Sequence, residues 1–236
     1  MNAAIEPGAD GRTLAARFAQ DGFAVLPALL SARESDDAAE ALARRGAGGA
    51  RQLLDEPWCA ELARRLLSDA RLAGAIPHGH VTVQCTAFEK SREHNWLVAI
   101  HQDVAIPVAA RVDDPALGGW SNKAGTWFVQ PPVDVLAGLV ALRVHLDDCG
   151  PDDGPLRVVP ASHLDGRLDD AAAIALRDAR GSLACPVPRG GAMLMRPLLL
   201  HASTKATGTS RRRVLHFLFG PLTLPHGLAW APPQRA

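Results

Sequence analysis

The sequence predicts a mainly β protein with flanking helices, built as a sandwich or jelly roll. Helical apolar spacing is concentrated in the first third of the chain. Many short strand-like runs follow, separated by Gly, Pro and Asp turns. With 236 residues, 47% of them hydrophobic, the chain can form one large β domain. We therefore expect a single domain over residues 1–236, with a helical N-terminal layer at about 11–72 and a jelly-roll core at about 78–220.

The N-terminal layer is expected to hold three helices, because apolar residues recur there at helical spacing. They are Thr13–Gln20, the segment from Ser31 to about Arg45, and Glu56–Leu72, with a loop at Gly46–Gly49 after the second. Ser31 is a favoured N-cap, and Glu34 stands at the capping-box position three residues later. These helices predict a packing layer rather than a site of chemistry.

Seven segments are expected to be strands, because they are short, apolar or alternating, and bounded by turn residues. They are Phe23–Leu26, Val81–Phe88, a buried run Leu97–Ile100 leading to His101, Leu139–Leu146, Leu156–Val159, Ala192–Arg196 and Arg212–Phe219. The expected connections are polar turns at Glu89–Asn95, Gly150–Gly154 and Ala202–Ser210, a corner at Pro160–His163, and a short helix at Leu168–Asp178.

Val104–Gln130 is expected to be a long irregular flap, because prolines and a Gly-Gly pair interrupt it. Segments of this length without regular structure are usually functional or disordered. The embedded Trp120 and Trp127 favour an ordered flap.

The composition excludes several classes of partner. Lys+Arg and Asp+Glu number 25 each, so the formal net charge is zero and no basic surface for nucleic acid or anionic lipid is expected. No apolar run approaches the roughly 18 residues of a membrane span, and the N-terminus lacks a signal-peptide pattern. The four cysteines form no CxxC pair and are expected to be reduced thiols. These features predict a cytoplasmic protein without a nucleic-acid or membrane partner, and they set no oligomeric state.

The stretch Asn95–Asp103 contains the motif His101-Gln102-Asp103. In a strand, alternate residues point to one face, so His101 and Asp103 would present an imidazole and a carboxylate side by side. Buried polar groups need partners, and a metal ion would satisfy both. The alternative is that both are ordinary strand residues held by hydrogen bonds, because so short a motif arises easily by chance.

One distant histidine would complete a 2-His-1-carboxylate triad, which suits non-haem Fe(II) and leaves three coordination sites open. The candidates are His145, His163, His201 and His216. His201 ends an apolar run, and the basic strand Arg211–Phe217 begins ten residues later. A co-substrate with a distal carboxylate needs a buried guanidinium. Alternation places Arg212 on one face and Arg211 and Arg213 on the other, and we favour Arg212.

An ordered series of segments extends this pattern over roughly residues 20–220. It comprises Phe88-Glu89-Lys90, Asn95-Trp96, His101-Gln102-Asp103, Leu142–Cys149, Gly154–His163, Arg189-Gly190-Gly191, His201-Ala202-Ser203 and Arg211–His216. In this series the chain resembles the phytanoyl-CoA dioxygenase (PhyH-like) family of Fe(II)/2-oxoglutarate-dependent oxygenases. Two turns depart from the family pattern, at Asp153-Gly154 and at Pro160-Ala161, and they put the local turn shape in doubt.

The resemblance implies a double-stranded β-helix, the cupin-like jelly roll, with helices packed outside. It implies that His101, Asp103 and His201 are the iron ligands and that Arg212 holds the far carboxylate of 2-oxoglutarate. Ser203 matches a position that supports that carboxylate, and Gln84 one that contacts the co-substrate. Lys90, Asn95 and Trp96 line up with recurring residues whose role does not follow from the sequence.

The expected activity is therefore that of a non-haem Fe(II)/2-oxoglutarate-dependent dioxygenase. It would use O₂ to hydroxylate a small or medium-sized metabolite and release succinate and CO₂, with the Val104–Gln130 flap helping to select the substrate. One rival is a cupin-like metalloprotein that uses no 2-oxoglutarate. The feature that discriminates between this rival and the 2-oxoglutarate-dependent enzyme is whether Arg212 faces the metal. The other rival is a non-catalytic binding barrel. The sequence does not choose the substrate.

Overall fold

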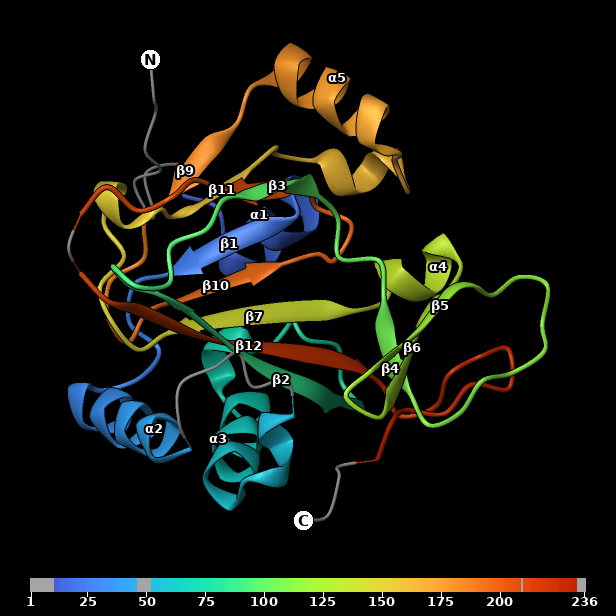
Figure 1. The fold of residues 1–236 in the computed structure, drawn as a ribbon, viewed down its shortest axis with the longest axis horizontal. Helices are drawn as coiled ribbons and strands as arrows, with labels where there is room; N and C mark the ends of the chain where they lie inside the picture. The colour runs from blue at the N-terminus through green and yellow to red at the C-terminus, as the bar shows by residue number, and fades with distance from the viewer. Residues whose placement is uncertain (1–10, 46–51, 209, 233–236) are drawn as a thin grey trace.

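The computed structural model describes residues 11–45, 52–208 and 210–232, and its strands form three antiparallel sheets (Figure 1). The five-stranded sheet has the order β1 (Phe23–Leu26), β10 (Ala192–Met195), β7 (Val140–His145), β12 (Arg212–Pro221) and β2 (His80–Lys90). The four-stranded sheet has the order β3 (Val98–His101), β11 (His201–Ser203), β8 (Leu156–Val158) and β9 (Leu183–Cys185). The predicted jelly-roll class, mainly β with flanking helices, is confirmed.

The helices pack outside these sheets. They are α1 (Leu14–Asp21), α2 (Ala32–Arg44), α3 (Pro57–Leu67), α4 (Val133–Ala137) and α5 (Asp170–Arg180). In Figure 1, α2 and α3 lie below the five-stranded sheet and α5 lies above the four-stranded one. None of the helices in the described residues combines the length and apolar character that crossing a membrane requires.

The two faces of the five-stranded sheet have different environments. On β12, Leu215, Phe217 and Phe219 are completely buried in one cluster with residues of α1, α2 and α3. Burying side chains of this size contributes about 1.5–3 kcal/mol each. Because side chains alternate along a strand, Arg212 and His216 point the other way, into a cavity between the sheets. The packing of the helices on one face of the sheet therefore determines which residues of β12 face the cavity between the sheets.

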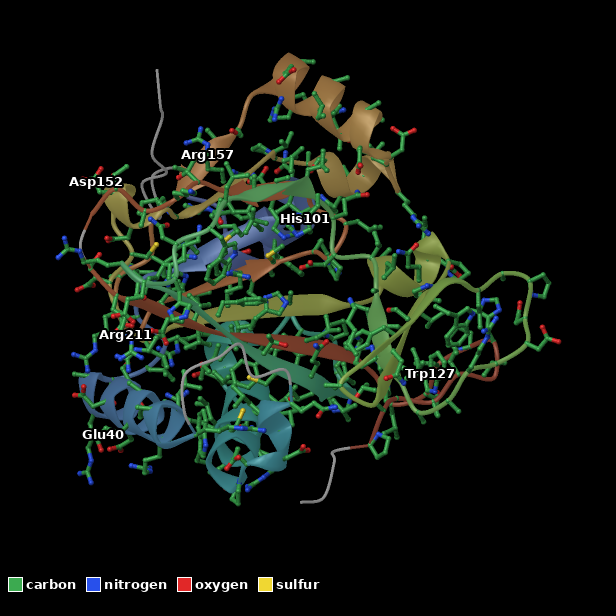
Figure 2. The ribbon with its side chains drawn as sticks, in the orientation of Figure 1. Glu40, His101, Trp127, Asp152, Arg157 and Arg211 are labelled. Atoms are coloured by element: carbon green, nitrogen blue, oxygen red, sulfur yellow. The ribbon has the colours of Figure 1, made fainter. Side chains whose placement is uncertain are left out.

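The expectation of an irregular flap at Val104–Gln130 is wrong. This segment forms a third sheet, in the order β4 (Ile106–Val108), β6 (Thr126–Gln130) and β5 (Gly118–Lys123). Ala124 and Gly125 connect β5 to β6 with φ angles of 51° and 84°, which is the two-residue hairpin turn that suits the strand twist. Ala-Gly is a weaker hairpin-turn signal than Asn-Gly, so the local sequence does not predict this hairpin. Figure 2 shows Trp127 on this sheet, at the side of the molecule.

The second N-terminal helix begins at its predicted cap, and the first is capped by Thr13, which was expected to be its first helical residue. Ser31 and Glu34 form the reciprocal capping box of α2, and the Thr13 side chain accepts from the Ala16 amide at the start of α1. The expected third helix is too long, because α3 ends at Leu67. The Asp69 carboxylate accepts from the Arg71 amide and starts a separate 3₁₀ turn. The expected loop Gly46–Gly49 lies outside the described residues.

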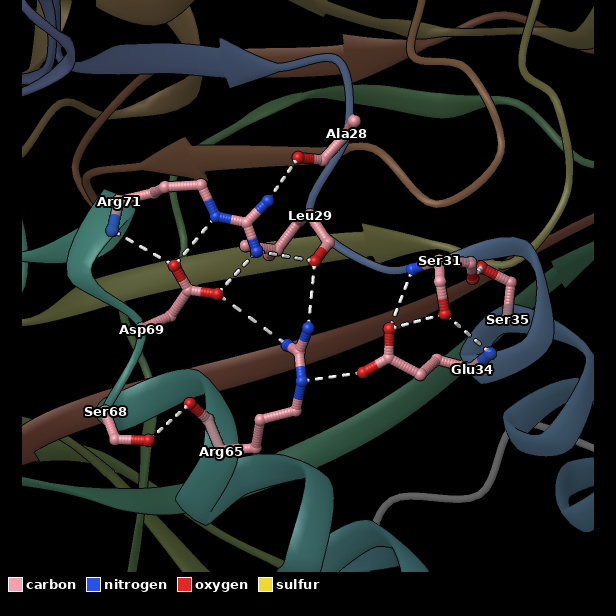
Figure 3. Close-up of polar contacts among 9 residues, drawn as sticks. All are labelled: Ala28, Leu29, Ser31, Glu34, Ser35, Arg65, Ser68, Asp69 and Arg71. Carbon is pink, nitrogen blue, oxygen red and sulfur yellow. Dashed lines mark hydrogen bonds and ion pairs between the residues drawn. The ribbon is translucent and has the colours of Figure 1, made fainter.

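Two arginines fasten this helical layer to the segment after β1 (Figure 3). Arg71 donates to the carbonyl oxygens of Ala28 and Leu29, at 2.7 and 2.8 Å. Arg65 donates to the same Leu29 oxygen at 3.1 Å and pairs with Glu34 at 2.7 Å. The segment between β1 and α2 is therefore held by side chains of α3 and the turn that follows it.

Several boundaries differ from the sequence expectations. The run Leu97–Ile100 is not a buried strand. Leu97 precedes β3 and is 61% exposed, and β3 is an edge strand of its sheet. The turn expected at Glu89 begins later, since β2 continues to Lys90. Helix α5 begins two residues late because Asp169 caps it. Three short elements, β9, β11 and α4, were not predicted, and β11 occupies the start of the turn expected at Ala202.

The two turns that depart from the family pattern keep left-handed conformations. Gly154 has φ +62°, and a Cβ there would come within 2.6 Å of the Thr204 carbonyl oxygen, so glycine is required. Ala161 has φ +60° although it carries a Cβ. Its amide donates to the Asp21 carbonyl oxygen at 2.8 Å, which holds the corner against the end of α1.

We predict that Ala161→Gly raises the free energy of unfolding by about 0.5–1 kcal/mol in urea denaturation. A left-handed residue other than glycine costs about 1–2 kcal/mol, and the greater freedom of glycine in the unfolded chain offsets part of that gain. The control is Ala175→Gly at an exposed position in the interior of α5, which should lower stability by about 1 kcal/mol. Similar losses in both variants would contradict this account of the corner.

Candidate metal centre

Among the described residues, one group of His, Cys, Asp and Glu side chains has its donor atoms close enough to share a metal ion. It comprises His101, Asp103 and His201, whose donor atoms all lie within 4.8 Å of one another. Each histidine Nε2 lies 3.7 Å from a carboxylate oxygen of Asp103. Ligand atoms bind such a metal at about 2.1 Å, so two of them can be up to about 4.2 Å apart. Both 3.7 Å separations are below this limit, so each histidine can share one ion with Asp103.

Strand pairing brings the two histidines together. His101 ends β3, and the register of β3 with β11 places it directly opposite His201, with the ring centroids 4.2 Å apart. Asp103 lies beyond the end of β3, and its amide donates to the Pro197 carbonyl oxygen at 2.9 Å. The Gln102 side chain donates to the carbonyl oxygens of Gly166 and Leu198 at 2.7 Å. These bonds hold the segment that carries Asp103.

Both imidazoles have their Nε2 atoms free for a metal. Nδ1 of His101 lies 2.8 Å from the Ala99 carbonyl oxygen, and Nδ1 of His201 lies 2.9 Å from that of Leu199. A carbonyl oxygen only accepts, so each Nδ1 donates, and Nε2 keeps its lone pair. Burial lowers the pKa of His201 to about 4, so this ring is neutral at pH 7.

Asp103 supplies the negative charge of the group. Burial acts to raise its pKa, but the neighbouring imidazoles, His201 first, outweigh burial and hold the pKa below its ordinary value. Two imidazoles and one carboxylate form the donor set of non-haem Fe(II) sites with open positions.

The cluster lines a cavity of about 370 Å³ between the two larger sheets. Arg212 also lines this cavity and is only 4% exposed. Its Nη1 donates to the Gly154 carbonyl oxygen, and its Nε has no acceptor among the described residues. Arg211 and Arg213 instead pair with Glu89 and Asp147. Figure 2 shows His101 near the centre of the molecule and Arg211 at its edge.

Lys90 is a cavity residue whose role sequence reasoning did not find. It pairs with Arg212 in the register of β2 with β12 and is 1% exposed. Its Nζ donates to Ser203 Oγ at 2.8 Å and to the Thr204 carbonyl oxygen at 2.5 Å. Burial, then the nearby Arg212, lowers the pKa of Lys90 to about 8. Continuing the alternation of β2 by two residues beyond Phe88 would have predicted that it faces inward.

Asn95 and Trp96 have structural contacts that the sequence could not supply. The Asn95 amide exchanges two hydrogen bonds with the backbone of Ala206, each 2.8 Å long. The Lys90 ammonium lies 5.9 Å from the centre of the Trp96 ring. Together they hold the segment after β2 over the segment that follows Ser203.

The remaining sequence candidates are distributed as follows. Gln84 lines the cavity and donates to Thr86 Oγ1 at 3.1 Å. His216 lines it too, beside Arg143. His145 is buried outside the cavity lining, and His163 lies in the corner, where its ring contacts Gly22.

A profile of the phytanoyl-CoA dioxygenase family matches residues 18–214. The chain belongs to this family, which places it among the Fe(II)/2-oxoglutarate-dependent oxygenases. A search of curated protein sequences finds no match.

Solved structures share the fold at low sequence identity. The non-heme alpha ketoglutarate dependent epimerase SnoN from nogalamycin biosynthesis has a TM-score of 0.67 at 18% identity, covering 94% of this chain and 91% of its own. EctD from S. alaskensis in its apoform gives 0.66 at 19%, covering 98% and 87%. HygX from Streptomyces hygroscopicus with nickel and 2-oxoglutarate gives 0.58 at 19%, covering 86% and 84%.

We predict that Asn95→Ala lowers the free energy of unfolding by about 1–2 kcal/mol, because two hydrogen bonds to the Ala206 backbone are lost. Asn122→Ala is the matched control, since it removes one exposed hydrogen bond to the Gly125 amide and should cost about 0.5 kcal/mol. Urea denaturation measures both. Equal losses of stability in the two variants would show that the two Asn95 hydrogen bonds contribute no more than the single exposed bond of Asn122.

Proposed function

We propose that this protein is an Fe(II)/2-oxoglutarate-dependent hydroxylase of a small or medium-sized metabolite. The observation that carries the proposal is that one cavity is lined by two groups. These are the three metal-binding side chains and the buried cations Arg212 and Lys90. A cupin-like metalloprotein without 2-oxoglutarate has no need for such cations, and a binding barrel has no need for the triad.

In this proposal His101, Asp103 and His201 hold the iron. Their donor set suits Fe(II), and three protein ligands leave coordination sites for a co-substrate and O₂. When bound, iron with 2-oxoglutarate and O₂ supplies the oxidising chemistry, with succinate and CO₂ as products. The Nδ1 bonds to Ala99 and Leu199 keep both imidazoles aimed at the ion.

Arg212 and Lys90 would bind the far carboxylate of 2-oxoglutarate. Ser203, on the same strand as His201, accepts from the Lys90 ammonium and would support that carboxylate. Guanidinium and ammonium groups donate charge-assisted hydrogen bonds to carboxylates. The buried Arg212 Nε without an acceptor is the kind of group that a ligand oxygen satisfies. Gln84 lines the same cavity but pairs with Leu218, six residues beyond Arg212 on β12. Its proposed contact with the co-substrate is therefore at the metal-binding end and not at the far carboxylate.

The rest of the cavity would orient the substrate and exclude water. Leu139, Leu156 and Leu218 contribute apolar walls, and Phe128 and Lys123 contribute from the small sheet of β4, β5 and β6. Excluding water strengthens the electrostatic contacts inside the site. HygX has been solved with hygromycin B, nickel and 2-oxoglutarate bound, which supports a small-molecule substrate here. SnoN is an epimerase, so product analysis must separate hydroxylation from epimerisation.

We predict that Asp103→Ala lowers Fe(II)-dependent succinate formation from 2-oxoglutarate by about 100-fold or more. Removing a ligand should cost at least as much as removing a group that merely supports one. The assay uses anaerobically iron-loaded protein, started by adding oxygen. The control is Asp37→Ala, which removes an exposed carboxylate of α2. Unchanged turnover in Asp103→Ala would eliminate the triad assignment.

We also predict that Arg212→Leu and Lys90→Met each weaken 2-oxoglutarate binding by about 10- to 100-fold, because each removes a charge-assisted hydrogen bond to the carboxylate. Calorimetric titration of the Ni(II)-loaded protein measures this without turnover. Arg211→Leu removes the same charge from the residue before β12, which pairs with Glu89 outside the cavity, and should change the affinity by less than about twofold. An equal effect of all three substitutions would argue for a general charge effect rather than a binding site.

A further inference from the structure

A second buried guanidinium lines the same cavity and has no role in the proposed co-substrate site. Arg143, on β7, is 8% exposed. Its Nη1 lies 3.1 Å from His216 Nδ1, and its guanidinium carbon lies 5.3 Å from the centre of the Phe88 ring. Its Nε is buried with no acceptor among the described residues.

His216 fixes the orientation of this guanidinium. Burial, then the adjacent Arg143, lowers the pKa of His216 to about 3, so the ring is neutral. Arginine only donates, so Nδ1 of His216 accepts from Arg143. Arg143 is thereby held at Nη1, and its other edge, which carries Nε and Nη2, is left for a ligand.

That free edge is the one that holds carboxylates elsewhere in this protein. Arg211 bonds Glu89 through Nε and Nη2 at 2.8 and 2.9 Å. Arg213 bonds Asp147 through the same two atoms at 2.8 and 2.6 Å. Such paired bonds match the planar geometry of a carboxylate. Arg143 has the same edge with no carboxylate beside it.

The backbone positions of Arg143 and His216 lie farther along the sheet than those of the co-substrate pair, Arg212 and Lys90. His216 is directly opposite Arg143 in the strand register, and it follows Arg212 by four residues on β12, which is about 13 Å along a strand. The carbon chain of 2-oxoglutarate is about 5 Å long. Arg143 and His216 also line the cavity together with His101, Asp103 and His201.

The charge of the cavity leaves room for one more anion. Lys90, Lys123, Arg143 and Arg212 line it, and Asp103 is the one carboxylate among the described residues that do so. The charges of a divalent metal and of doubly charged 2-oxoglutarate cancel each other. The loaded cavity would therefore keep a positive excess, and a neutral or cationic substrate would leave that excess unpaired.

We propose that Arg143, positioned by His216, binds a carboxylate of the substrate, so that the enzyme acts on a carboxylic acid. The inference rests on the proposed function and goes beyond it by naming the substrate class. The carboxylate would accept from Nε and Nη2 of Arg143 while the carbon to be oxidised lies toward the metal. Lys123, at the mouth of the cavity, would attract such an anion.

The test uses benzoate as the probe and benzamide as its uncharged counterpart of the same shape. The full-length protein is loaded with Ni(II), and 2-oxoglutarate binding is measured first by calorimetry. Benzoate and benzamide are then titrated into the loaded complex of wild type, Arg143→Met and Arg211→Leu. Circular dichroism confirms folding, and Arg143→Lys replaces Arg143→Met if the latter does not fold.

Benzoate should bind the loaded wild type at least about tenfold more tightly than benzamide does, and Arg143→Met should remove that preference. Arg211→Leu should keep it, and Arg143→Lys should keep the charge but weaken benzoate because the paired geometry is lost. The affinity of Arg143→Met for 2-oxoglutarate should stay within about twofold of wild type.

Three results would overturn the proposal. Equal binding of benzoate and benzamide to the loaded wild type would remove the anion subsite. Equal benzoate affinity in wild type and Arg143→Met would place that subsite elsewhere. A tenfold loss of 2-oxoglutarate affinity in Arg143→Met would make Arg143 a co-substrate residue. Failure of wild type to bind 2-oxoglutarate at all would instead refute the proposed function on which this inference rests.

Discussion

The pairing of β3 with β11 is the contact on which the rest of the site depends. It sets His101 directly opposite His201 across an antiparallel ladder, although the two residues are a hundred positions apart in the chain. The backbone carbonyls of Ala99 and Leu199 then fix both rings from behind. A shift of one residue in this register would turn one imidazole to the opposite face of the sheet. The candidate metal-binding group therefore depends on strand register as well as on the local His101-Gln102-Asp103 motif.

The opposite wall of the cavity is built on a different principle, because it buries charge. Burial, then Arg212, lowers the pKa values of Lys90 to about 8 and of Arg143 to about 10. Unpaired cations in an interior destabilise a fold, and here the large apolar clusters on both faces of the five-stranded sheet offset that cost. Anionic ligands would relieve the repulsion. The buried cations would thus lower the stability of the unliganded protein and raise the affinity of the cavity for anions.

Much of this arrangement could be predicted from local pattern. Alternation along Arg212–Phe219 separates inward Arg212 from outward Arg211 and Arg213, and the capping residues Ser31 and Glu34 mark the start of α2. Other features depend on tertiary contacts. Leu97 is exposed just before the edge strand β3, an arrangement that no local pattern encodes. Asn95 is explained only by the Ala206 backbone 111 residues away. The orientation of Arg143 depends on its hydrogen bond to His216 on a neighbouring strand.

The most direct test of this account is a crystal structure of the protein prepared anaerobically with Mn(II) and 2-oxoglutarate. The account predicts one metal ion bound by His101 Nε2, Asp103 and His201 Nε2, with the far carboxylate of 2-oxoglutarate on Arg212 and Lys90 and Arg143 left free of the co-substrate. A metal ion bound by other residues, or 2-oxoglutarate held by Arg143 instead of Arg212, would contradict it.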